Sequence, residues 1–177
     1  MNQMTLTLQS SDFEIFGLSP QFVVDRSILD ARWKDLQREA HPDRFATADA
    51  QAQRQAMQWS VRINEAYQRL KDPIKRASYL CELNGTPVGA ENNTAMPAEF
   101  LMQQMQWRED LEEACGVADL ERMAQEVAKA RKDMLEALRV TADDQRDFPA
   151  AAQQVRALMF VERFASDVEH RLDQLGK

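Results

Sequence analysis

His41 stands two residues before Asp43, and it is one of only two histidines in the 177-residue sequence. A histidine beside a carboxylate can transfer protons, so this pair is the first candidate for acid–base chemistry. Pro42 argues against that role because it splays the two side chains, and no nucleophile, glycine-rich phosphate loop or second histidine lies nearby in the sequence. We therefore interpret the tripeptide as a rigid contact loop and predict no catalytic residue.

Metal chemistry is equally poorly supported by the sequence. Cys81 and Cys115 are isolated, and neither belongs to a CxxC pair or has a histidine close by. With His41 and His170 as the only histidines, a zinc site would be hard to assemble. We expect both cysteines to be reduced packing residues, and we expect no metal and no cofactor.

Helical patterns on both sides position the tripeptide. Asp25 can cap a helix whose apolar residues recur at steps of three and four, namely Ile28, Leu29, Trp33, Leu36 and Ala40. Pro42 disfavours helical geometry at His41, so this helix should end near Ala40. A second pattern runs from about Asp49 to Asp72-Pro73 through Met57, Val61, Asn64, Ala66, Tyr67 and Leu70. The sequence predicts two antiparallel helices that meet at the loop.

Composition favours an almost entirely helical protein that does not bind nucleic acid. Glycine and proline are scarce, with five and six residues, and 44% of the side chains are apolar, enough for one moderate core or two small ones. The net charge of −7 disfavours phosphate recognition. Residues 1–82 hold 11 basic and 11 acidic groups and residues 83–177 hold 11 and 18, which indicates different partners for the two halves.

No targeting or membrane segment is visible in the sequence. The first ten residues contain no Lys or Arg, and no segment approaches the roughly 20 apolar residues of a membrane span. We expect a cytoplasmic protein with no membrane partner.

A run of helix-breaking residues at 84–97 marks a boundary between two domains. Beyond it, helical patterns cover about 98–114, 118–140 and 144–175, with breaks at Cys115-Gly116 and around Thr141-Ala142. Three consecutive helices with short connections predict an antiparallel three-helix bundle.

Two of these helices carry large apolar residues outside their core stripes. The first helix has a core stripe of Phe100, Gln103, Trp107, Leu111 and Ala114. Roughly 100° away lies a second stripe of Leu101, Met105, Glu109 and Glu113, with Met102 beside it. In the last helix Phe160 points roughly 130° from the middle of a core set formed by Val155, Leu158, Val161, Ala165, Val168 and Leu172. These extra residues either pack against the N-terminal domain or bind a partner, and adaptable Met side chains beside carboxylates suit the second alternative.

The segments 13–18, 31–40 and 63–70, together with His41-Pro42-Asp43-Arg44-Phe45 and Asp72-Pro73, resemble a J domain. The C-terminal half has no Gly/Phe-rich or cysteine-rich zinc region. Instead, residues 76–80 and 100–105 resemble the HscB family, the co-chaperones of iron–sulfur cluster assembly. Two positions depart from that resemblance, because Gln106 replaces a frequent acidic residue and Ala40 replaces a frequent aromatic residue.

The resemblance implies two binding surfaces and no enzymatic step. A DnaK-type chaperone, HscA, would bind a surface formed by Arg32, Lys34, Arg38, His41, Pro42, Asp43 and Arg44, and its ATPase would be stimulated. An IscU-type cluster scaffold would bind a surface formed by Leu101, Met102, Met105, Glu109, Glu113 and Phe160. The alternative is a J-domain co-chaperone of a general folding chaperone, with the bundle as a dimerisation module.

The expected organisation follows from these inferences. The fold class is all-α, with an N-terminal J domain at residues 11–83 and a three-helix bundle that binds the scaffold at 98–177. Residues 1–10 form an N-terminal extension, and residues 84–97 form the linker.

Overall fold

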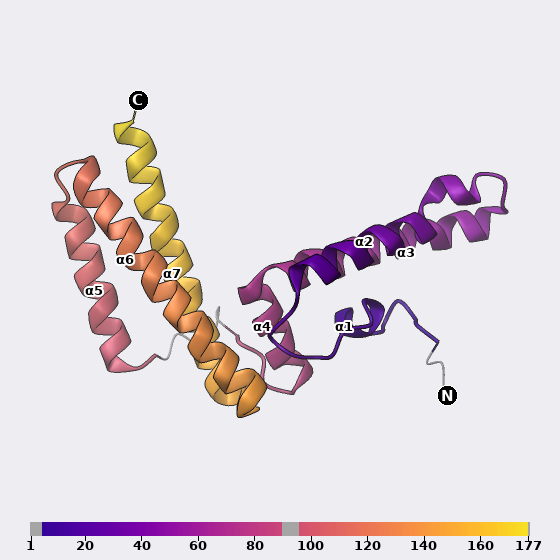
Figure 1. The fold of residues 1–177 in the computed structure, drawn as a ribbon, viewed down its shortest axis with the longest axis horizontal. Helices are drawn as coiled ribbons and strands as arrows, with labels where there is room; N and C mark the ends of the chain where they lie inside the picture. The colour runs from indigo at the N-terminus through magenta and orange to yellow at the C-terminus, as the bar shows by residue number, and fades with distance from the viewer. Residues whose placement is uncertain (1–4, 90–95, 177) are drawn as a thin grey trace. The chain divides into compact units, whose positions relative to one another are not determined.

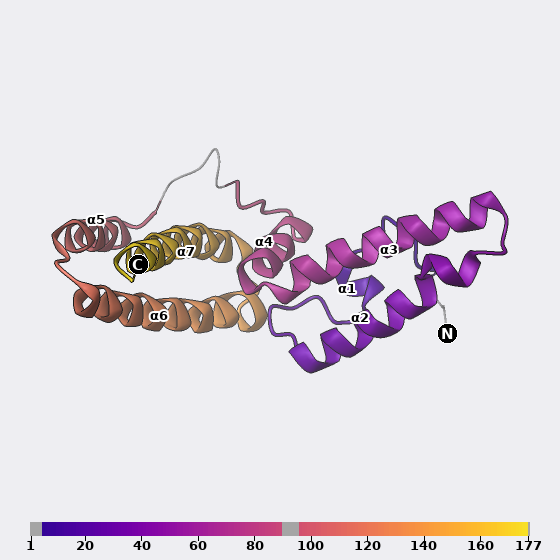
Figure 2. The same ribbon diagram turned by 90° about the horizontal axis from the view of Figure 1, so that it is seen from above.

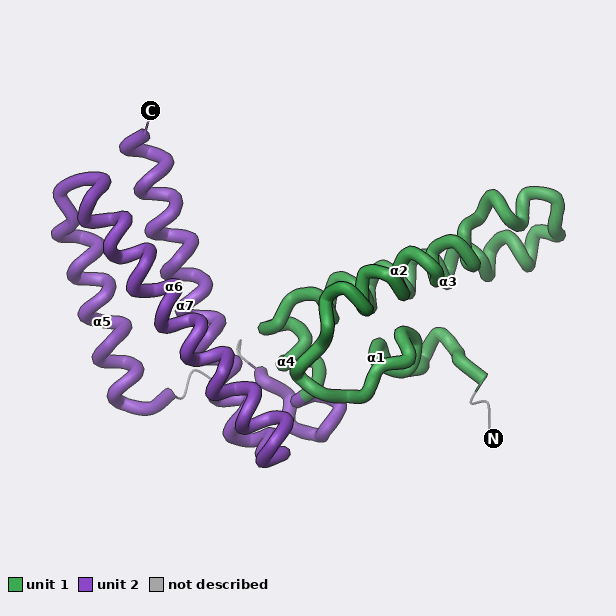
Figure 3. Tube along the Cα trace, in the orientation of Figure 1, with its two compact units in different colours: residues 1–80 green, residues 81–177 purple. Residues whose placement is uncertain are grey.

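The computed structural model describes residues 5–89 and 96–176, and within those ranges it is built of helices and their connections (Figure 1). It forms two compact units, Met1–Leu80 and Cys81–Lys177 (Figure 3). The first contains α1 (Asp12–Ile15), α2 (Arg26–Ala40), the 3₁₀ turn η1 (Pro42–Phe45) and α3 (Ala50–Lys71). Helix α4 (Pro73–Leu83) spans the boundary between the units. The second contains α5 (Ala98–Glu113), α6 (Val117–Arg139), the π turn η2 (Val140–Asp144) and α7 (Phe148–Leu175).

Both helices of the α2–α3 hairpin begin at an aspartate cap, of which the sequence predicted Asp25. The Asp25 side chain accepts hydrogen bonds from the amides of Ser27 and Ile28, and the Asp49 side chain accepts one from Ala52. His41 leaves the helix with a ψ of 130° because Pro42 follows it. Trp33 then stacks on Tyr67 with ring centroids 4.9 Å apart, so the two helices run antiparallel and side by side (Figure 2).

The face that α3 buries differs from the predicted stripe. Its fully buried side chains are those of Ala56, Ile63, Ala66 and Leu70, whereas Met57 and Val61 are exposed. The small and apolar residues of α3 are spread over two faces of an ideal helix, so the pattern alone does not show which face is buried. Contact with α2 and α1 decides which one is buried.

A buried ion network attaches α1 to α3. The Asp12 carboxylate is inaccessible to solvent, accepts hydrogen bonds from Arg69 and forms an ion pair with Arg62. The Arg62 guanidinium also donates to the backbone oxygens of Leu8 and Ser10, at 2.9 and 2.8 Å. Two residues of the predicted N-terminal extension, Leu8 and Ser10, are therefore bound to α3, and residues 1–4 lie outside the described part of the chain.

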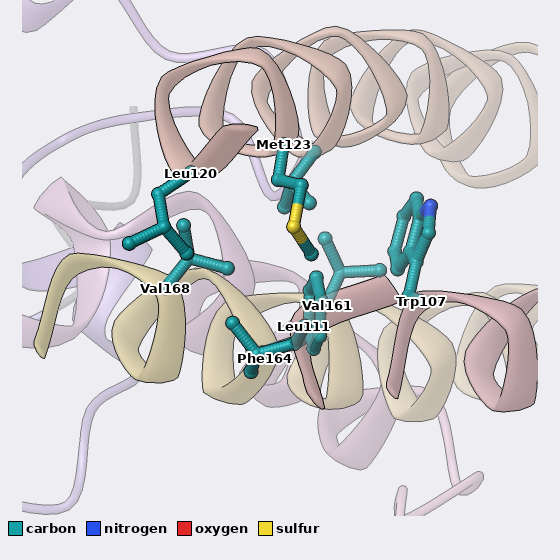
Figure 4. Close-up of a cluster of buried hydrophobic side chains, with 8 residues drawn as sticks. Trp107, Leu111, Leu120, Met123, Val161, Phe164 and Val168 are labelled. Carbon is teal, nitrogen blue, oxygen red and sulfur yellow. The ribbon is translucent and has the colours of Figure 1, made fainter. Parts of the chain in front are cut away.

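The second unit is a three-helix bundle with one apolar core. Its buried cluster draws from all three helices, as Figure 4 shows: Trp107, Leu111, Leu120, Met123, Val127, Val161, Phe164 and Val168. The contacts Trp107–Phe164, Arg108–Asp167 and Leu111–Arg171 rise together along α5 and α7, so these two helices run parallel. Helix α6 runs antiparallel to both (Figure 1). The expected all-α fold is thus confirmed.

Three details of the bundle correct the sequence predictions. Gln103 is exposed and Gln104 faces inward with its amide nitrogen buried. Thr141 and Ala142, predicted to break a helix, are buried in the π turn that continues α6. Helix α7 begins at Phe148 and not near 144, because the Asp147 side chain caps it and Pro149 suits the first turn.

The predicted linker lies only partly in the described chain. Arg156 on α7 is buried and donates to the backbone oxygen of Val88 at 2.8 Å, which attaches this residue of the linker to the bundle. Residues 90–95 of the linker lie outside the described ranges.

Candidate functional site

The tripeptide projects from the end of the hairpin with its polar side chains in solvent. The side chains of His41 and Asp43 are 55% and 92% exposed. The amide of Asp43 donates to Nδ1 of His41 at 3.2 Å, which in the neutral ring leaves the proton on Nε2. Pro42 occupies the first position of η1, so the geometry of the turn is constrained by its ring. His41 therefore presents its Nε2 edge, and Asp43 its carboxylate, to solvent.

Backbone hydrogen bonds hold this loop in place. The amide of Arg44 donates to the carbonyl of His41 at 3.0 Å. From α3, the side-chain amide of Gln53 donates to the carbonyls of Ala46 and Ala48, at 3.2 and 3.1 Å. These hydrogen bonds thus fix the loop to the end of the hairpin, and a loop of fixed geometry is suited to binding.

The four predicted basic residues around the loop do not form one surface. Lys34 and Arg38 are exposed and share a face of α2, because four residues rotate a helix by roughly 40°. Arg44 is exposed in η1, with Nη1 3.5 Å from the Glu39 carbonyl. Arg32 lies on another side of α2 and donates to the carbonyls of Phe16 and Gly17, both at 2.5 Å. These two hydrogen bonds attach the end of α1 to α2.

An apolar pocket of about 320 Å³ opens beside the loop. Its wall comes from α2, η1, α3 and the N-terminal segment, and its lining residues are Leu6, Leu36, Glu39, Ala40, Phe45, Ala52, Gln55, Ala56, Trp59 and Ile63. Several of these side chains are only methyl groups. Ala40, Ala52 and Ala56 each contribute a single methyl group to the wall, which leaves this space open.

The second predicted surface is an exposed apolar patch on α5. Leu101, Met102 and Met105 are 45%, 70% and 66% exposed, although the opposite side of the same helix carries the buried Trp107 and Leu111. Glu109 and Glu113 are exposed one and two turns further along. This helix therefore has a face with substantial exposed apolar area that ends in carboxylates.

Phe160 belongs to the same side of the bundle by the register of α5 and α7. Nη1 of Arg108 lies 2.6 Å from Oδ2 of Asp167, and counting back seven residues from each reaches Leu101 and Phe160. Seven residues are about two turns, so parallel helices place these two side chains at matching heights along the same seam. Phe160 is partly exposed there. The sequence predicted each residue separately, and the tertiary structure brings them together.

One residue of this surface was not predicted. The guanidinium carbon of Arg163 lies 5.6 Å from the centroid of the Phe160 ring. Its spacing of three residues from Phe160 is a signal in the sequence, since such pairs are neighbours on a helix. Only the packing of α7 in the bundle shows which way this face of the helix points.

Comparison with known proteins places this geometry in a family. Residues 96–169 match the family profile described as the HSCB C-terminal oligomerisation domain. The Co-chaperone protein HscB homolog of Burkholderia multivorans is 46% identical over 173 residues, which cover 96% of this chain and 98% of that protein. The chain belongs to the HscB family of co-chaperones.

Solved structures of HscB proteins agree with this assignment. Chaperone HscB from Vibrio cholerae has a TM-score of 0.82 and 38% identity, covering 94% of this chain and 99% of the other. The human co-chaperone protein HscB has a TM-score of 0.87 over 94% of this chain and 84% of its own, and at 24% identity it supports the fold alone. The N-terminal hairpin with its His-Pro-Asp loop is thus a J domain, as the sequence predicted.

No helix in the described ranges is both long and apolar enough to cross a bilayer. Over the same ranges, His, Cys, Asp and Glu side chains do not gather into a group of three able to hold a metal ion.

Proposed function

We propose that this HscB-family protein binds an IscU-type cluster scaffold through its bundle and stimulates the ATPase of a DnaK-type chaperone, HscA, through its J domain. Its activity is the delivery of the scaffold and the triggering of the chaperone in the cytoplasm, so that the iron–sulfur cluster passes to acceptor proteins. The protein itself breaks no bond. In this proposal the J domain comprises residues 11–83 and the scaffold-binding bundle residues 98–177.

The chaperone contact rests on the loop and on the cations near it. His41, Pro42 and Asp43 provide a held, solvent-facing polar contact. Lys34, Arg38 and Arg44 provide the positive charge that steers an acidic partner surface toward it. Stimulation requires that this surface bind the hydrolysis-competent state of the chaperone better than its other state. Arg32 supports the site indirectly, through the carbonyls of Phe16 and Gly17.

One observation supports the scaffold contact more than any other. The bundle has a complete apolar core and, in addition, exposes an apolar patch. Leu101, Met102 and Met105 lie outside the buried core cluster and keep 45%, 70% and 66% of their surface exposed. Glu109 and Glu113 border them, and Phe160 joins Leu101 along the α5–α7 seam. Binding both partners on one chain raises the effective concentration of scaffold at the chaperone.

Two assays with the purified protein test the two surfaces separately. Leu101→Ala combined with Phe160→Ala should weaken binding to the scaffold and leave stimulation of the chaperone ATPase by the J domain alone unchanged. His41→Gln should abolish that stimulation and leave scaffold binding unchanged. Gln103→Ala, an exposed substitution on the other side of α5, is the matched control. Scaffold binding that survives the double substitution would remove the support for this surface.

A second candidate function is self-association of the bundle in a co-chaperone of a general folding chaperone. The description of the matching family profile as an oligomerisation domain favours it. Light scattering across a range of concentrations distinguishes the two, because a dimer that uses the α5 patch would dissociate on Leu101→Ala. A constant monomer mass would leave the patch available to the scaffold.

A further inference from the structure

Among the residues that the structure describes, Arg163 is the one positively charged group that lies against the ring of Phe160, the aromatic residue of the proposed scaffold surface. Its guanidinium carbon lies 5.6 Å from the Phe160 ring centroid, and its side chain is exposed. Cation–π attraction acts on the charge and uses none of the five N–H donors of the arginine. The contact with the ring thus restrains the side chain while its hydrogen-bonding capacity remains.

The nearest carboxylates along the helix are occupied elsewhere. Asp167, one turn after Arg163, pairs with Arg108 of α5 at 2.6 Å. Glu162, the adjacent residue, pairs with Arg131 of α6. Among the described residues, Arg163 has no carboxylate within ion-pair distance. An arginine that is restrained and has no anionic partner is suited to bind a carboxylate, because the planar fork of its N–H donors matches the two carboxylate oxygens.

The charged residues around the apolar patch are also distributed asymmetrically, with opposite signs on its two edges. Steps of four residues from Leu101 to Met105 to Glu109 turn by roughly 40° each, away from the seam with α7. On α7 the step from Phe160 to Arg163 turns roughly 60° toward solvent on the opposite edge. The patch therefore has carboxylates on its α5 edge and a guanidinium on its α7 edge. A partner with complementary charges would fit in one orientation only.

We propose that Arg163 is a specificity-determining residue of the scaffold surface, where it binds a carboxylate of an Asp or Glu side chain on the scaffold and fixes its orientation. This inference rests on the proposed function of the bundle. Phe160 then has two roles, as an apolar contact and as the platform that holds the arginine in place.

Calorimetric binding of the purified full-length chain to the scaffold protein, at low and high salt, tests this role. Arg163→Glu should weaken binding by about tenfold or more at low salt, and less at high salt. Arg163→Lys should recover only part of the affinity, because a lysine lacks the planar fork. Lys132→Glu, which makes the same change of charge at an exposed position of α6, is the matched control and should leave affinity near that of the wild type.

The possible failures are distinguishable. If Arg163→Glu binds like the wild type while the Leu101→Ala, Phe160→Ala protein does not bind, the role of Arg163 is overturned and the proposed function stands. Equal weakening by Lys132→Glu would reduce the effect to net charge and would also overturn it. If the wild type does not bind the scaffold at all, both proposals fail. A series of Asp→Lys and Glu→Lys scaffold variants should contain one that restores binding to Arg163→Glu.

Discussion

Arg108 on α5 and Asp167 on α7 form an ion pair, with Nη1 of the arginine 2.6 Å from Oδ2 of the aspartate. Both side chains are nearly half exposed, so the pair contributes little to the stability of the bundle. Its significance lies in register, because it shows which residues of the two parallel helices are neighbours. The same register places Leu101 and Phe160 on a shared surface.

The aromatic stack beside this ion pair should contribute much more than the pair does to the stability of the bundle. Trp107 and Phe164 lie with ring centroids 5.3 Å apart and are both buried. Trp107→Ala should lower the free energy of unfolding by about 3–5 kcal/mol, whereas Arg108→Ala should lower it by about 1 kcal/mol at most. Urea denaturation followed by circular dichroism measures both. Similar losses for the two variants would show that the bundle does not depend on its core in this way.

The different positions of Arg32 and its neighbours on α2 predict different phenotypes. Arg32→Ala removes two hydrogen bonds to backbone carbonyls and should cost about 1–3 kcal/mol of stability. Lys34→Ala with Arg38→Ala should leave stability nearly unchanged, lower the stimulation of the chaperone ATPase and reduce its dependence on salt. Denaturation curves and ATPase assays at two salt concentrations separate these effects. An Arg32→Ala protein of full stability that fails to stimulate would instead indicate direct contact with the chaperone.

Asp12 should be among the most sensitive charged positions of the J domain. Its carboxylate is completely buried and is bound by Arg62 and Arg69, so removing its charge leaves two guanidinium groups without their anion. Asp12→Asn should lower the free energy of unfolding by about 3–5 kcal/mol. The exposed Glu14→Gln, two residues away, is the control and should have little effect in the same denaturation experiment. Comparable stability of both variants would contradict the network's role in attaching α1.

The two cysteines should react at very different rates. Burial raises the pKa of the Cys81 thiol to about 11, so at pH 8 only about one molecule in a thousand carries the reactive thiolate. Cys115 is exposed. A thiol reagent at pH 8 should label Cys115 rapidly and reach Cys81 only in denaturant or as the pH rises toward 11. Mass spectrometry of the labelled peptides identifies the site, and Cys115→Ser should leave the native protein almost unlabelled.

Filling the pocket beside the loop should stabilise the J domain. Ala40→Leu adds apolar atoms to a space of about 320 Å³ and should raise the free energy of unfolding by about 0.5–2 kcal/mol. Because the added atoms would enter a pocket whose lining includes neither His41 nor Asp43, stimulation of the chaperone by these two residues should persist. Ala50→Leu, at an exposed position of α3, is the control for a general increase in hydrophobicity. Thermal melts decide the matter, and a lower melting temperature for Ala40→Leu would mean that the pocket cannot accept the side chain.

Periodicity alone could not choose the inner face of α5. Relative to the middle of the stripe formed by Phe100, Trp107, Leu111 and Ala114, Gln103 and Gln104 lie roughly 50° to either side on an ideal helix. Both residues are glutamine, so composition does not separate them either. Contact with α7 on one side turns Gln104 inward, and a single sequence contains no information about that contact.

What the sequence by itself determined was local. Caps at Asp25 and Asp49 and the ring of Pro42 set the ends of the hairpin helices, because each acts on backbone atoms within a few residues. The tertiary structure alone decided the attachment of Arg32 to α1 and the shared seam of Leu101 and Phe160. Those relationships join residues from about 15 to 60 positions apart, and only the packing of whole helices brings such residues together.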